Sequence, residues 1–157
     1  MRDFNEADRK KKNTRIRIQE NPGNLSQEML SQIEGTVKAS LKDGYLPCSV
    51  AWKIAKEANV PKVATGEITD RLGIRITDCQ IGCFKVEKTP HDNSVDTVDI
   101  NVDGEIITIL ETLKENNQLT CAKVFDLARQ FKLEPMVIAN EANVRDLKIH
   151  GCQLGCF

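Results

Sequence analysis

The chain runs LPCSVAWKIAKEANVPKVATGEITDRLGIRITDCQIGCF from Leu46 to Phe84, and repeats this pattern as LTCAKVFDLARQFKLEPMVIANEANVRDLKIHGCQLGCF from Leu119 to Phe157. At the offset of 73 residues (119 minus 46), all six cysteines fall into register. Most of the apolar positions between them also stay apolar. Self-similarity at a fixed period indicates tandem structural units. We therefore expect two similar modules, at 25–84 and 98–157.

Within each copy, the apolar residues follow the spacing of three short helices. In the second copy the first helix is expected from Glu105 to Leu113, the second follows the capping residue Thr120, and Pro135 opens the third. The alternating segment Leu147–Ile149 predicts a short strand, and the terminal Cys-Gln-Leu-Gly-Cys-Phe predicts a turn or the start of a second strand. The first copy repeats this plan with a helix at 28–41, helices opened by Pro47 and Pro61, and a strand at 74–76.

This plan resembles the winged helix-turn-helix superfamily: three short helices, a tight turn between the second and third, and a strand pair after them. The resemblance covers about three quarters of the chain. It rests on helix spacing and on Ala55 and Ala128, small residues that let the turn close. It implies a mainly α fold with small β wings, in tandem duplicated modules. It also implies duplex DNA as the partner, with the third helix in the major groove and the wing on the backbone.

Basic residues that suit phosphate contacts lie in the N-terminal arm, 1–24, and around the third helix and strand of each copy. Between Arg2 and Glu20 the arm holds seven basic and four acidic residues, a composition that predicts a solvated, disordered leader able to track phosphates. The candidate DNA contacts are Lys10, Lys11, Lys12, Arg15, Arg17, Lys62, Arg71, Arg75, Arg145 and Lys148.

The repeated cysteines leave several interpretations open. They suit apolar core positions, a disulfide within a Cys-x3-Cys pair, or an exposed thiolate pair that senses redox state. They also suit ligation of zinc or an iron–sulfur cluster, the two candidate cofactors. In the second copy His150 would complete a Cys3His set, whereas Thr77 stands at that position in the first copy. The candidate ligands are Cys48, Cys79, Cys83, Cys121, Cys152, Cys156 and His150.

Composition places the chain among ordinary globular proteins. It has 157 residues, of which 40% are hydrophobic and 29% charged, and this usage excludes wholesale disorder. No apolar stretch approaches the roughly 18 residues of a membrane-spanning helix, and the N-terminus is polar. We therefore expect a soluble, cytoplasmic protein without a membrane partner. The polar segment 85–97 is expected to be a linker.

No enzymatic motif is present: the sequence has no Gly-rich phosphate loop, no Gly-x-Ser-x-Gly and no His-Glu-x-x-His. The leading hypothesis is a non-enzymatic, DNA-binding transcriptional regulator with cysteine-based redox or metal sensing. The alternative is a metal- or iron–sulfur-associated scaffold that docks on a redox protein or assembly factor. A third interpretation is a protein-interaction module with core cysteines. The oligomeric state is not predicted.

Overall fold

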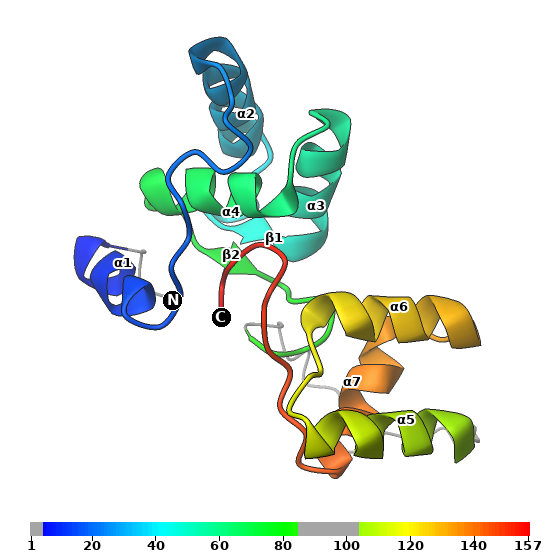
Figure 1. Cartoon of the computed structure of the whole chain (residues 1–157). Coiled ribbons are helices and arrows are strands. Elements are labelled where there is room, and N and C mark those ends of the chain that lie inside the picture. The colour runs from blue at the N-terminus through cyan, green and yellow to red at the C-terminus, as the bar shows by residue number, and fades with distance from the viewer. Residues whose placement is uncertain (1–4, 85–103) are drawn as a thin grey trace. The chain divides into compact units, whose positions relative to one another are not determined.

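Across the residues that the structure describes, the protein is mainly helical with a small two-stranded sheet, as the sequence predicts. The computed structural model describes residues 5–84 and 104–157, and the predicted linker at 85–97 lies outside them. The chain divides into two compact units (Figure 1). Unit 1 comprises Met1–Gln80 and Gly151–Phe157, and unit 2 comprises Ile81–His150. None of the helices within the described residues is long and apolar enough to cross a membrane.

Unit 1 contains the three helices expected of the first copy. The Ser26 side chain caps the first of these helices by accepting a hydrogen bond from Met29 N at 3.3 Å, whereas Pro47 and Pro61 stand at the next two N-caps without a side-chain cap. The predicted helix starts are therefore confirmed to within one residue. The elements are α2 (Gln27–Ala39), β1 (Leu46–Pro47), α3 (Cys48–Glu57), α4 (Lys62–Arg71) and β2 (Ile76–Thr77).

Helix α4 is the buried centre of unit 1. All six residues from Ala64 to Thr69 are buried, so no polar face of this helix points to solvent over that stretch. The apolar faces of α2 and α3 pack near it, contributing fully or almost fully buried side chains such as Val37 and Ile54. A helix buried all round is a core element rather than a surface helix.

The predicted β wing does not form in unit 1. The strand expected at 74–76 is a two-residue strand, β2, and it pairs in parallel with β1 in the register Leu46↔Ile76 and Pro47↔Thr77. Directly after β2, Asp78 adopts φ 49°, which ends the extended backbone. Since β2 finds its partner in the strand that precedes α3, it needs no following hairpin strand.

Unit 2 contains α5 (Gly104–Glu115), α6 (Cys121–Phe131) and α7 (Pro135–Val144). Thr120 caps α6 by accepting a hydrogen bond from Lys123 N at 3.2 Å, and Pro135 lies in the first turn of α7, so both predictions are confirmed. The strand expected at Leu147–Ile149 is reduced to one parallel bridge between Thr120 and His150. The backbone of His150 accepts from Cys121 N at 2.9 Å and donates to Leu119 O at 2.8 Å.

Where the structure describes the N-terminal arm, it contains a helix, whereas the composition predicts a disordered leader. Helix α1 (Glu6–Asn13) begins with a reciprocal capping box between Asn5 and Asp8. It is then held to unit 1 by ion pairs, Arg75–Asp8 at 2.9 Å, Lys12–Asp70, and Arg9–Glu67 at 3.9 Å. The basic side chains expected to track phosphates therefore partly neutralise carboxylates of the protein itself.

The segment 151–157 belongs to unit 1, although it ends the second copy in the sequence; we call it the C-terminal segment. Its backbone crosses α4 at Gly66, where any Cβ would overlap the carbonyl oxygen of Leu154. Leu154 is fully buried, and Lys62 Nζ donates to Gln153 Oε1 at 2.7 Å. Residues 81–84 conversely belong to unit 2, where a Cβ at Gly82 would lie 3.1 Å from Met136 Sδ. The units therefore do not follow the expected boundaries, 25–84 and 98–157.

Candidate functional site

The C-terminal segment folds into a turn that brings two thiols together. Gly155 N donates to Cys152 O at 2.8 Å, and Cys152 N donates to Phe157 O at 3.0 Å. Gly155 adopts φ +68°, a left-handed conformation that glycine takes without strain. The turn that the sequence predicts here is thus confirmed, and it places the Cys156 thiol within hydrogen-bonding reach of the Cys152 sulfur.

This thiol–thiol hydrogen bond separates the acidities of the two cysteines. The pKa of Cys152 falls from 9.0 to about 6, chiefly because the Cys156 side chain donates to the Cys152 thiolate; burial opposes this, and backbone donors of Cys156 and Leu154 add to it. The pKa of Cys156 is raised, first because that thiol keeps its proton to donate and then because it is buried. Near neutral pH the pair therefore holds one proton between two sulfurs.

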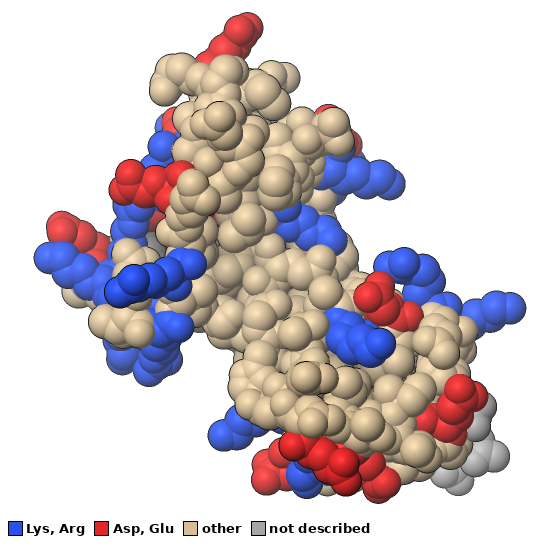
Figure 2. Space-filling view, in the orientation of Figure 1, with Lys and Arg blue, Asp and Glu red and all other residues tan. Residues whose placement is uncertain are grey.

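The dithiol lies beside a cavity of about 340 Å³ within unit 1. Both ends of the chain contribute to the cavity wall, since α1 and the residues after it face the C-terminal segment. Figure 2 shows Lys and Arg side chains gathered over α1. The cavity is lined by Asp8, Lys11, Lys12, Arg15, Ile16, Arg75, Cys156 and Phe157.

The cations around this cavity fall into two classes. Lys12 and Arg75 are largely buried and pair with Asp70 and Asp8, respectively. Lys11 and Arg15 are exposed, and neither makes an ion pair within residues 5–84 and 104–157. The cavity therefore presents positive charge to solvent next to the Cys156 thiol.

The other cysteines have environments that suit packing. Cys48 is buried; burial raises its pKa to about 11, although Gln80 Nε2 donates to its sulfur at 3.6 Å. Cys79 and Cys121 are also buried, and Cys83 is exposed. A thiol with a raised pKa is a poor nucleophile at neutral pH. Cys48 thus behaves as the core interpretation predicts, whereas Cys152 and Cys156 do not.

Of the predicted metal ligands, Cys152 and Cys156 lie together, but within the described residues no third ligand completes a metal-binding group. Within the described residues, no group of three or more His, Cys, Asp or Glu side chains is placed to hold a metal ion. The expected Cys3His set divides between the units, because the chain leaves unit 2 after His150 and Cys152 and Cys156 pack in unit 1. His150 is exposed, and its Nε2 lies 2.8 Å from Asn117 Oδ1. Ligation of zinc or an iron–sulfur cluster by these residues therefore stays a prediction.

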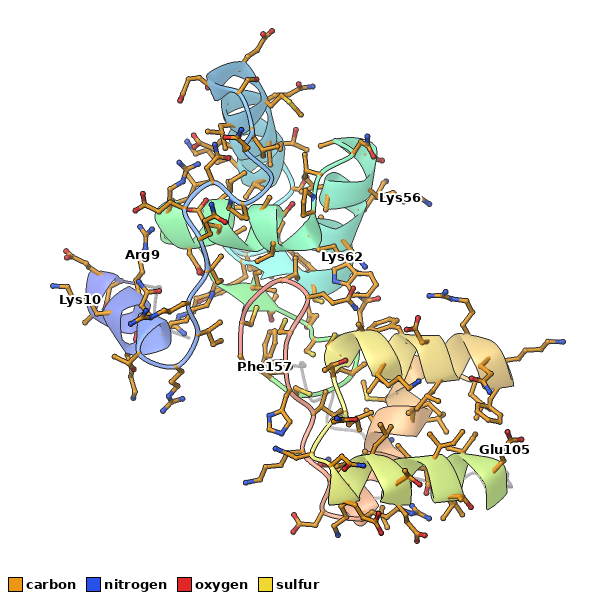
Figure 3. All side chains as sticks on the ribbon, viewed as in Figure 1. Arg9, Lys10, Lys56, Lys62, Glu105 and Phe157 are labelled. Atoms are coloured by element: carbon orange, nitrogen blue, oxygen red, sulfur yellow. The ribbon has the colours of Figure 1, made fainter. Side chains whose placement is uncertain are left out.

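Most of the predicted DNA contacts are engaged inside the protein. Beyond Lys12 and Arg75, Lys62 lies 3.7 Å from the Trp52 ring centroid and bonds Gln153. Figure 3 shows Lys10 on the outer side of α1 and Arg9 on the side toward α4. The remaining ion pairs are Lys10–Glu6, Arg71–Glu34, Arg71–Glu67 and Arg145–Glu141. The predicted contacts outside any ion pair, within the part of the chain that the structure describes, are Lys11, Arg15, Arg17, Lys62 and Lys148.

The helix expected to enter a major groove is enclosed in unit 1. Residues 64–69 of α4 are buried and the C-terminal segment crosses them at Gly66. A recognition helix must offer side chains to base edges, so α4 cannot serve as one in this state. In unit 2, α7 buries only Ile138, Ala139 and Ala142.

Comparisons with protein-family models, with curated proteins and with solved structures find no match to this chain. The resemblance to winged helix-turn-helix proteins therefore stays a prediction. Function has to be argued from the site itself, since fold and function are separable.

Sequence reasoning found the two cysteines of this site but missed their surroundings. Lys12 and Asp70 are 58 residues apart, and no local pattern connects them. One signal was available: Gly66 stands in the middle of a helical pattern, where glycine costs stability and therefore indicates a packing reason such as the close approach of another backbone.

Proposed function

We propose that this chain is a thiol-based redox-responsive regulator in which Cys152 and Cys156 cycle between a dithiol and a disulfide. The observation that carries the proposal is the backbone turn of the C-terminal segment, which brings Cys152 and Cys156 together; the lowered pKa of Cys152 supports it. A low-pKa thiolate with a second thiol in reach is the arrangement of redox-sensing cysteines. Cys48 differs from this pair, because its raised pKa keeps the thiol protonated at neutral pH.

The chemistry is a two-electron oxidation. The pair loses two electrons and two protons as the Sγ–Sγ bond forms. The electrons go to a disulfide, which is cleaved to two thiols, or to a peroxide, which is reduced to water or an alcohol and water. Bridged cysteines need α-carbons within about 7 Å. The turn closed by the Cys152–Phe157 and Gly155–Cys152 backbone hydrogen bonds supports such an approach.

The output of the switch is proposed to be exposure of α4. The C-terminal segment carries both thiols and also covers α4 at Gly66. A disulfide formed within the segment would therefore alter how the segment packs on α4. The predicted winged-helix character of α4 makes duplex DNA the proposed partner, bound when the segment has moved. This part of the proposal rests on the resemblance.

Two further observations support the proposed duplication of the modules. Pro47 pairs with Thr77, and the residues 73 positions later, Thr120 and His150, also form a parallel bridge. Gly155 lies close to Val63, and the residues at the equivalent positions of the other copy, Gly82 and Met136, also lie close together. Equivalent residues thus make equivalent contacts in each unit.

The redox proposal is tested by oxidising the reduced protein with substoichiometric hydrogen peroxide and mapping disulfides by peptide mass spectrometry. The expected first product is an intramolecular Cys152–Cys156 disulfide. It should persist in the variant Cys79→Ser/Cys83→Ser, which removes the pair at equivalent positions of the first copy. Oxidation that spares Cys152 and Cys156, or that starts at Cys48, would refute the proposal.

The DNA output is tested separately by titrating random duplex DNA into the reduced and the oxidised protein at low and high salt. A redox-dependent affinity that falls steeply with salt is expected. Equal absence of binding in both states would remove DNA as the partner and leave the redox proposal standing.

A further inference from the structure

The cavity beside Cys156 has the size of a small-molecule site. Ligand pockets in proteins span roughly 300–1,000 Å³, and this cavity, at about 340 Å³, suits a compact ligand. Its lining combines apolar surface from Ile16 and Phe157 with charged side chains from α1 and from Arg75. The Cys156 thiol forms part of the same wall.

The charge of the lining selects the sign of the ligand. The lining has four basic side chains, Lys11, Lys12, Arg15 and Arg75, and one acidic side chain, Asp8. Asp70, which does not line the cavity, pairs with Lys12. Lys11 and Arg15 are exposed and make no ion pair within the described residues, so their charge is available to a ligand. A concave surface lined by one sign of charge concentrates ions of the opposite sign.

We propose that this cavity binds the carboxylates of a small anionic disulfide and presents its S–S bond to the Cys152–Cys156 pair. The inference rests on the proposed redox function, since it names the oxidant class that the Cys152–Cys156 pair meets. A peroxide is small and uncharged and would draw no advantage from Lys11 and Arg15. A disulfide that carries carboxylates uses the cations, the apolar wall and the thiol together.

The exchange balances over two steps. In the first, the Cys152 thiolate attacks one sulfur of the bound disulfide and expels one small thiolate, which takes the proton of the Cys156 thiol. In the second, the Cys156 thiolate formed in this way attacks Cys152 Sγ, which expels the other small thiolate. The products are a Cys152–Cys156 disulfide, one small thiol and one small thiolate, so two electrons have passed to the small disulfide.

The test compares three disulfides of similar reactivity and different charge on the full chain: oxidised glutathione (anionic), bis-hydroxyethyl disulfide (neutral) and cystamine (cationic). The rate of Cys152–Cys156 disulfide formation is followed by quenched alkylation and mass spectrometry at low ionic strength. We expect oxidised glutathione to react on the order of tenfold faster than the neutral disulfide, and cystamine to react more slowly than either. Added salt should reduce the difference.

Reversing the charge of two cavity cations then tests whether the preference for oxidised glutathione arises in the cavity. Lys11→Glu/Arg15→Glu is expected to abolish the preference for oxidised glutathione and to leave the rate with the neutral disulfide within about twofold. The matched control is Lys10→Glu, a reversal on the outer side of the same helix at a side chain that does not line the cavity. It should retain most of the preference.

The outcomes separate the two proposals. Equal rates with all three disulfides would overturn the anion site and leave the redox dithiol standing. A preference for the anionic disulfide that survives Lys11→Glu/Arg15→Glu would place the selectivity outside the cavity and would also overturn the inference. No Cys152–Cys156 disulfide with any of the three would count against both proposals.

Discussion

At the scale of single residues, the C-terminal segment shows why identical sequence motifs acquire different chemistry. Cys-Gln-x-Gly-Cys-Phe occurs twice, and the repeat predicts equal roles for both thiol pairs. In the structure Cys79 is buried and Cys83 exposed, whereas Cys152 and Cys156 share a hydrogen bond. The motif was thus visible in the sequence, but its partners were not, because they come from α1, which lines the same cavity, and from α4, which the segment crosses at Gly66.

The alkylation of Cys152 should follow an unusual pH profile. Because its pKa is lowered to about 6, the reactive thiolate is present above that pH, and the rate with iodoacetamide should rise near pH 6 and level off by about pH 7. Cys156→Ala removes the donor, so the midpoint should move toward 9.0 and the rate at pH 7 should fall by one to two orders of magnitude. Site-resolved mass spectrometry measures both. An unchanged midpoint in Cys156→Ala would contradict this account.

The buried carboxylate of Glu67 should weaken the folded state as pH rises. Only 6% of its side chain is exposed, and burial raises its pKa although Arg71 and Arg9 lower it. A carboxyl whose folded pKa is raised ionises more easily in the unfolded chain, so stability is lost as pH rises from 4 to 7. Glu67→Gln should therefore gain in unfolding free energy, relative to the unsubstituted protein, between pH 4 and pH 7. Urea unfolding at both pH values measures this, and the exposed Glu57→Gln should show no such trend.

At the scale of elements, helices were predictable and strands were not. Local signals such as Thr120 and Pro135 fix where helices begin, and they act within one turn of the chain. Strand pairing depends on a distant partner, and β2 pairs with a segment 30 residues earlier in the register Leu46↔Ile76 (76 minus 46). The family expectation of a hairpin wing therefore failed where a parallel partner was already in place.

The close approach of the C-terminal segment to α4 predicts a strong effect of one methyl group. Gly66→Ala should lower the unfolding free energy by about 1–3 kcal/mol, because the new Cβ would overlap the carbonyl of Leu154 and displace the segment. It should also change the alkylation rates of Cys152 and Cys156. Gly35→Ala on α2 is the control: nothing lies within 4 Å of its Cβ, so it should gain up to about 1 kcal/mol. Equal stabilisation by both substitutions would disprove the close approach.

At the scale of the whole molecule, each compact unit is completed by the last residues of the other copy of the repeat. Leu154, from the second copy, is buried in unit 1, and Ile81, from the first copy, is buried in unit 2. The sequence predicts two modules from the repeat, but a repeat cannot tell which copy receives a segment that fits both. The boundaries of the units therefore had to come from the structure.

Because each copy packs its last residues into the other unit, a substitution in one copy should loosen the unit formed mainly by the other copy. Leu154→Ala should destabilise by about 2–5 kcal/mol, as for a fully buried leucine, and should raise amide hydrogen exchange in α4 of unit 1 rather than in α7. Ile81→Ala, at the equivalent position of the first copy, should raise exchange in α7 and leave α4 protected. Exchange measured peptide by peptide distinguishes the two patterns. If each substitution loosened the helices of its own copy instead, the segments would pack within their own modules, and the proposed control of α4 by the Cys152–Cys156 pair would lose its structural basis.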